Sequence, residues 1–111
     1  MRYRPLGNTG WHVSELGLGT YPLGGAVRTS GSYWSGPATY GAVARDEAIA
    51  TIHVAVAHGV SYLDTAPNYG EAEPFIRDAI RTWAGVAAAR QCYVGTKCGE
   101  HVRPAPDGGP P

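Results

Sequence analysis

Three polar side chains with the chemistry of a proton donor follow two neighbouring predicted strands. Asp64 ends an apolar run over 60–64, Tyr69 lies five residues further on, and Lys97 ends a run over 91–97. A tyrosine hydroxyl has an ordinary pKa near ~10, too high for an efficient proton donor at neutral pH. A neighbouring ammonium lowers such a pKa, and a carboxylate holds the ammonium charged and directed. Together the three side chains would form a general acid that protonates a carbonyl oxygen.

Two other interpretations of these residues stay open. The first is an ordinary buried Asp64–Lys97 pair with the loop residue Tyr69 over it. The second is that the presence of lysine at position 97 has no functional meaning. Lys97 is the only lysine among nine cationic side chains, and the other eight are arginine. Lysine differs from arginine because its pKa responds to burial and to neighbours. Chance in an arginine-rich genome would give the same count.

Strands and helices are predicted to alternate around this trio. A hairpin is expected over 2–14 and a strand over 16–20, followed by a long loop over 21–45. Asp46 is expected to cap a helix that stops at Gly59.

The second half continues with a strand over 60–64 and a helix that begins near Glu73-Pro74. A linker over 85–90 and a strand over 91–97 follow. The apolar stripe predicted for this helix consists of Phe75, Ile76, Ala79, Ile80 and Trp83.

This order predicts an α/β fold with parallel strands joined by right-handed crossovers. In such folds the catalytic groups gather at the carboxyl ends of the strands. Strand alternation places Tyr62 and Asp64 on one face, and it directs Lys97 inward beside Asp64. The predicted organisation is one barrel-forming part over 1–99 and a Gly/Pro-rich, disordered tail over 100–111.

Composition limits the classes of partner. The 111 residues contain nine basic and nine acidic side chains, which argues against a nucleic-acid or anionic-membrane partner. No apolar run approaches the ~20 residues of a membrane span, and no secretory leader is recognisable, so a cytoplasmic location is expected. Cys92 and Cys98 are interpreted as reduced thiols, and no metal site is expected.

Several motifs together resemble the aldo-keto reductase family. The run YLDTAPNYG at 62–70, preceded by Gly59-Val60, is similar to the family signature that carries a catalytic aspartate and tyrosine. The opening over 3–20 resembles the family's hairpin and first strand, and GTKCG at 95–99 resembles the strand that carries its catalytic lysine. The matches run in order from residue 2 to about residue 99.

The resemblance implies a (β/α)₈ barrel and NADPH-linked reduction of an aldehyde or ketone, or the reverse oxidation. Tyr69 would be the acid, Lys97 would lower its pKa, and Asp64 would hold Lys97. The residues implied to line the nicotinamide end of the cofactor are Gly19, Thr20, Tyr21 and Asp64.

The sequence also departs from the family pattern. A complete barrel needs roughly 250 residues, and three strands cannot close one. The fourth catalytic residue of the family, a histidine after the fourth strand, has no counterpart here. His101 comes too early, His53 and His58 are expected on the surface of the first helix, and His12 lies in the hairpin. We therefore expect an amino-terminal piece of the barrel, truncated and weakly active or inactive.

Two rival functions remain. Some proteins that resemble aldo-keto reductases are non-catalytic regulatory subunits, and this chain could be such a binding protein. It could also be a truncated product without function, or one that is stable only when its open sheet edge pairs with another chain.

Overall fold

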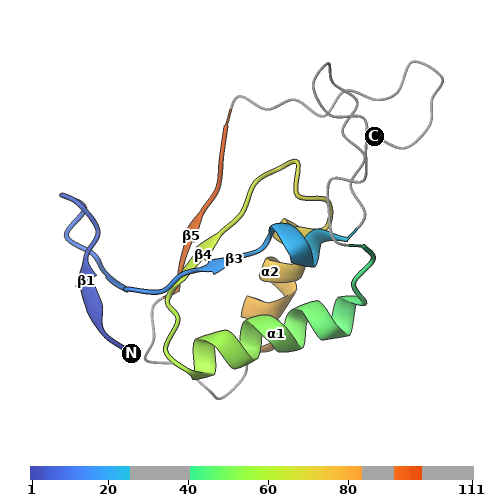
Figure 1. Ribbon diagram of the computed structural model, residues 1–111, viewed down its shortest axis with the longest axis horizontal. Helices are drawn as coiled ribbons and strands as arrows, with labels where there is room; N and C mark the ends of the chain where they lie inside the picture. Colours follow the sequence, from blue (N-terminus) through green and yellow to red (C-terminus); the bar gives the residue numbers. More distant parts are fainter. Residues whose placement is uncertain (26–40, 84–91, 99–111) are drawn as a thin grey trace.

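The computed structural model describes residues 1–25, 41–83 and 92–98. A three-stranded parallel sheet has the order β3-β4-β5, formed by β3 (Leu18–Gly19), β4 (Tyr62–Asp64) and β5 (Tyr93–Gly95). The crossovers contain α1 (Arg45–Ala57) and α2 (Ala72–Thr82), which lie on the same side of the sheet (Figure 1). This confirms the predicted partial α/β barrel, and the described residues contain no closed barrel.

Helix α1 begins at Arg45, earlier than predicted, and without the predicted cap. Ala44 occupies the N-cap position, where no side-chain hydrogen bond is made, and Asp46 lies in the first turn. At the other end Gly59 has a φ of 96°, and its N–H donates to Val56 at 2.9 Å. The N–H of Val60 donates to Ala55 at 3.1 Å, which completes a Schellman motif. Glycine therefore ends the helix as predicted and turns the chain back toward the sheet.

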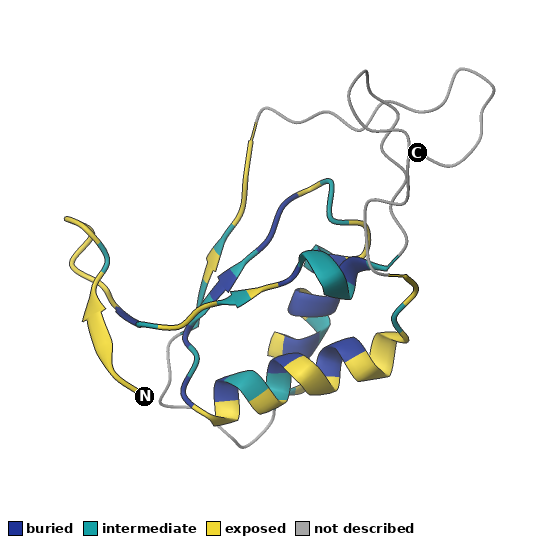
Figure 2. Ribbon diagram, in the orientation of Figure 1, coloured by how far each residue is buried: buried dark blue, intermediate teal, exposed yellow. Residues whose placement is uncertain are grey.

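The core lies between the two helices and the sheet, as the buried faces in Figure 2 show. Its buried cluster consists of Ile49, Ile52, Val56, Leu63, Ile76 and Ala79. Phe75 is buried as predicted, and Trp83 packs against the cluster. Ile80 is exposed, so the predicted stripe of α2 was wrong at this position. The part of the chain that the structure describes contains no candidate membrane-spanning helix.

The hairpin is formed by β1 (Tyr3–Pro5) and β2 (His12–Ser14), which pair in antiparallel register. It attaches to the amino ends of the parallel strands. The Tyr3 hydroxyl donates to the carbonyl of Gly59 at 2.9 Å, and the Trp11 ring stacks on Tyr93 with 4.8 Å between centroids. The carboxyl ends of β4 and β5, at the opposite end of the sheet, are therefore left uncovered by the hairpin.

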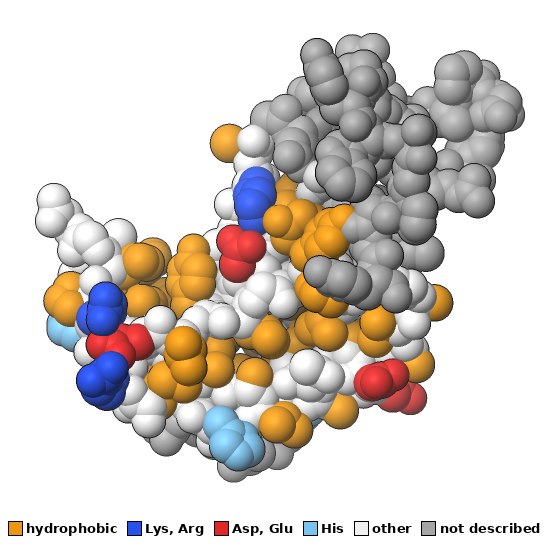
Figure 3. Space-filling view, viewed as in Figure 1, with side chains coloured by type: hydrophobic (Ala, Val, Ile, Leu, Met, Phe, Trp, Pro, Cys, Tyr) orange, Lys and Arg blue, Asp and Glu red, His pale blue; other side chains and the backbone are white. Residues whose placement is uncertain are grey.

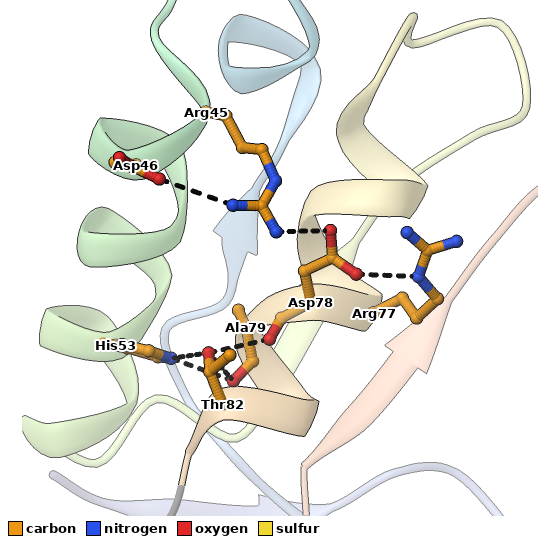
Figure 4. Close-up of polar contacts among 7 residues, drawn as sticks. All are labelled: Arg45, Asp46, His53, Arg77, Asp78, Ala79 and Thr82. Carbon is orange, nitrogen blue, oxygen red and sulfur yellow. Dashed lines mark hydrogen bonds and ion pairs between the residues drawn. The ribbon is translucent and has the colours of Figure 1, made fainter.

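A polar seam joins the two helices on their shared side (Figure 4). The Asp78 carboxylate accepts hydrogen bonds from Arg77 at 2.8 Å and from Arg45 of α1 at 2.9 Å. His53 Nε2 lies 2.8 Å from the Ala79 carbonyl oxygen. His53 is half-buried between the helices, which corrects its expected surface position, whereas His58 is exposed as expected.

We expect the seam to make the free energy of unfolding depend on pH in the acidic range. Arg77 and then Arg45 lower the pKa of Asp78 from 3.8 to about 2. A carboxyl whose pKa is lower in the folded state stabilises the fold above its unfolded pKa, and this contribution is lost as the pH falls toward the folded pKa. Asp78→Asn should therefore lower the free energy of unfolding at neutral pH, by an amount that shrinks between about pH 4 and pH 2.

Urea denaturation at several pH values measures this difference. Asp46→Asn is the matched control, because the Asp46 side chain is 95% exposed and contacts Arg45 at only 3.4 Å. A difference between the Asp78→Asn variant and the wild type that stays constant down to pH 2 would contradict the expectation.

Candidate active site

Asp64 and Lys97 meet at the carboxyl edge of the sheet. Asp64 is the last residue of β4 and pairs with Gly95, and Lys97 follows Gly95 by two residues. The Lys97 ammonium nitrogen lies 3.1 Å from each oxygen of the Asp64 carboxylate and 3.0 Å from the Thr65 carbonyl oxygen. On the face shown in Figure 3, basic and acidic side chains touch beside hydrophobic side chains.

Tyr69 lies next to this pair, in the loop between β4 and α2. The Lys97 nitrogen lies 4.7 Å from the centroid of its ring. The structure thus brings together the three residues that the sequence predicts to form a proton donor. The Lys97 and Asp64 side chains are 39% and 48% exposed. The pair is therefore partly open to solvent, unlike the buried ion pair of the alternative interpretation.

The charge state of Lys97 follows from these contacts. The Tyr69 side chain, as the largest cause, and the Asp64 carboxylate raise the pKa of Lys97 above its ordinary value of 10.5. Lys97 is therefore an ammonium at neutral pH and acts as a fixed positive charge, not as a nucleophile. Because the pKa is raised, this interaction stabilises the fold below pH 10.5 and is lost as the pH rises beyond it.

The direction of these side chains comes from strand alternation. Leu63 belongs to the core on the helix side of the sheet, and Cys92 packs against that core. Because side chains alternate along a strand, Asp64 and Lys97 lie on the other face. Tyr62 covers that face, and a Cβ added to Gly95 would overlap the Tyr62 hydroxyl. Glycine on β5 therefore leaves the space that the Tyr62 ring occupies.

The residues predicted to line the cofactor lie beside Asp64, with different exposure. Gly19 is exposed and pairs with Asp64 across the β3–β4 ladder. Thr20 is fully buried, and both its N–H and its hydroxyl donate to the Asp64 carbonyl, at 2.9 and 2.8 Å. The Thr20 hydroxyl proton is thus used to hold the end of β4. Tyr21 lies edge-on to Tyr69, with ring centroids 5.0 Å apart at an interplanar angle of 76°.

One polar contact near Lys97 was missed by the sequence reasoning. The Thr96 hydroxyl donates to Glu73 at 2.6 Å and so ties the end of β5 to the first turn of α2. Strand alternation points Thr96 to the helix side, which was predictable, but the partner 23 residues away was not. Residues 26–40 of the predicted loop over 21–45, the predicted linker over 85–90 and the predicted tail over 100–111 lie outside the described residues.

The two thiols should differ in reactivity. Cys98 is exposed, whereas Cys92 packs against the core, and burial raises the pKa of the Cys92 thiol. Because the thiolate is the reactive form, iodoacetamide at neutral pH should alkylate Cys98 first and Cys92 only slowly. Peptide mass spectrometry with time gives the two rates, and in denaturant they should converge. Equal rates in the native protein would contradict the described packing of Cys92.

Comparison with known proteins decides the family. The sequence model of the aldo/keto reductase family matches residues 15–110. The chain belongs to the aldo/keto reductase family. The family uses NAD(P)H, in agreement with the nicotinamide cofactor that the sequence motifs imply.

Individual members of the aldo/keto reductase family show the same relationship. An L-galactose dehydrogenase from Arabidopsis thaliana is 35% identical over 88% of this chain and 27% of its own length. An NADH-specific methylglyoxal reductase from Escherichia coli is 36% identical over 89% of this chain and 27% of its own length.

A solved structure agrees with these sequence matches. The crystal structure of a Pseudomonas aeruginosa protein assigned to the aldo-keto reductases superposes with a TM-score of 0.60 at 33% identity, over 87% of this chain and 33% of that one. The present chain thus spans about a quarter of the length of these curated relatives and a third of this solved chain.

Proposed function

We propose that this aldo/keto reductase chain supplies the proton-donating part of a site for reduction of an aldehyde or ketone by NAD(P)H, or for the reverse oxidation. The observation that carries the proposal is the Lys97 ammonium, held at 3.1 Å by both Asp64 oxygens and at 4.7 Å from the Tyr69 ring. In this arrangement the positive charge lies where it stabilises a tyrosinate.

Each of the three side chains has one task in this proposal. When bound, the nicotinamide supplies hydride to the carbonyl carbon. Tyr69 donates its hydroxyl proton to the carbonyl oxygen, which would otherwise develop a negative charge. Lys97 stabilises the phenolate that remains, and Asp64 keeps the ammonium next to the ring. Thr20 holds Asp64 through its backbone carbonyl, so it is a positioning residue in this scheme.

The cofactor preference is the finer part of the proposal. The motifs imply NADPH, whereas the Escherichia coli relative is NADH-specific by name. Gly19 and Tyr21 flank the Asp64 edge, where the nicotinamide end would lie, but discrimination between the two cofactors depends on the adenosine end. Fluorescence titrations with NADPH and NADH compare them directly. For the 111-residue chain alone we expect affinity weaker than micromolar, and micromolar binding would show this expectation wrong.

The activity itself is tested in a chimera. Residues 1–98 of this chain replace the aligned segment of the Escherichia coli relative, which supplies the rest of a barrel. We expect the chimera to oxidise NADH in the presence of methylglyoxal. A folded chimera that binds NADH without carbonyl-dependent oxidation would contradict the catalytic role and would favour the non-catalytic alternative.

The remaining partner and location expectations are proposals of the same kind. A small carbonyl compound is the expected partner, and a cytoplasmic location and self-association through the open edges of β3 and β5 are expected as well. Sedimentation of the 111-residue chain tests self-association, because an edge-paired dimer would dissociate on dilution.

A further inference from the structure

A short turn packs directly against the loop that carries Tyr69. The 3₁₀ turn η1 (Tyr21–Gly24) follows β3, and the Gly24 carbonyl accepts a hydrogen bond from the Glu71 N–H at 2.9 Å. Gly24 is buried, and a Cβ built there would overlap the backbone carbonyl of Tyr69. The two backbones therefore approach more closely than a residue with a side chain would allow.

The same turn also contacts the Tyr69 side chain. The Tyr21 ring meets the Tyr69 ring edge-on at 5.0 Å, a favourable arrangement for two aromatic rings. The turn is itself anchored, because the Leu23 N–H donates to the Thr20 carbonyl at 2.9 Å and Leu23 packs against the core. Thr20 in turn holds Asp64.

We propose that η1 is the positioning element of Tyr69, in which the Gly24 backbone sets the place of the loop and the Tyr21 ring sets the orientation of the phenol beside Lys97. The catalytic meaning of this positioning rests on the proposed function. Gly24 and Tyr21 act here through Tyr69 and are not themselves proton donors.

The proposal predicts a selective displacement. The atom that a Gly24 side chain would meet is a backbone oxygen, which cannot rotate away as the end of a flexible side chain could. The loop that carries Tyr69 must move instead. Lys97 would keep Asp64 and the Thr65 carbonyl, because β4 and β5 hold those partners independently of the loop. Lys97 would therefore lose only its Tyr69 contact.

The pKa of Lys97 reports on this contact, since Tyr69 is the largest cause that raises it. Lys97 is the only lysine, so lysine labelled with ¹³C at Cε gives one resonance to titrate in the 111-residue chain. We expect Gly24→Ala and Tyr69→Phe each to shift the Lys97 pKa toward 10.5. The double variant should shift it no further than Tyr69→Phe alone, because both changes remove the same interaction.

Gly7→Ala is the matched control. Gly7 has a φ of +51°, so alanine there strains the backbone, but nothing lies within 4 Å of its added Cβ. It should lower stability and leave the Lys97 pKa unchanged. If Gly24→Ala prevents folding, Tyr21→Leu removes the ring contact without backbone overlap, and it should also lower the Lys97 pKa in the wild-type but not the Tyr69→Phe background.

An unchanged Lys97 pKa in folded Gly24→Ala or in Tyr21→Leu would overturn the proposal, as would additive shifts in the double variant. The titration contains no cofactor and no carbonyl compound. Failure of this proposal is therefore distinguishable from failure of the proposed reductase activity, which the chimera measures.

Discussion

Replacing Leu63 by alanine should lower the free energy of unfolding by about 2–5 kcal/mol. Leu63 is fully buried in the central strand of the sheet and belongs to the cluster that contains Ile52 and Ile76. Truncation removes apolar contact with both helices and leaves a cavity between layers that cannot collapse fully. Because small domains are stable by only ~5–15 kcal/mol, this single change should remove a large share of the free energy of unfolding. Urea denaturation followed by circular dichroism measures it.

Leu16→Ala is the control for that prediction, since it removes the same atoms from a side chain that is 66% exposed. We expect it to change the free energy of unfolding by less than about 0.5 kcal/mol. Equal losses of unfolding free energy for the two variants would show that Leu63 of β4 is not packed against the helices in solution.

Replacing Tyr69 by phenylalanine should reduce carbonyl reduction by the chimera by about 10²–10⁴-fold. The substitution keeps the ring and its edge-on contact with Tyr21, but it removes the hydroxyl that interacts with Lys97 and the proton that the carbonyl oxygen must receive. Since that proton is transferred in the transition state, the loss should fall on kcat, with little change in KM. Steady-state kinetics with NADH and methylglyoxal measures both constants.

Tyr3→Phe is the matched control for Tyr69→Phe. It removes a hairpin hydroxyl that donates to the Gly59 carbonyl. This contact lies at the end of the sheet opposite to the candidate site. It should leave kcat near that of the unmodified chimera. A Tyr69→Phe chimera with full kcat would remove Tyr69 from the role of general acid.

The fold was predictable where local signals and pairing agree. Helix α2 begins at Ala72, close to the predicted Glu73-Pro74, because proline in a first turn loses no hydrogen bond. The sheet strands are shorter than predicted. The strands predicted over 16–20 and 91–97 are observed only at Leu18–Gly19 and Tyr93–Gly95. An apolar run shows where a strand can form, but the neighbouring strand decides how much of the run is paired.

The residues of the candidate site were predictable from the sequence, but the contacts that hold them in place were not. Asp64 and Lys97 follow from strand alternation and from the shared carboxyl edge of parallel strands. The Thr20 bond to Asp64 joins residues 44 positions apart. The close approach of Gly24 to the Tyr69 backbone likewise depends on how η1 packs on the loop. No local pattern contains such contacts, because they arise only when separate elements meet.

The pKa of Lys97 in the unmodified 111-residue chain tests the central claim most directly. If the ammonium rests on the Asp64 carboxylate beside the Tyr69 ring, its single ¹³C-labelled resonance titrates above pH 10.5. Titration at or below 10.5 would mean that neither partner stabilises the ammonium, and it would contradict the account.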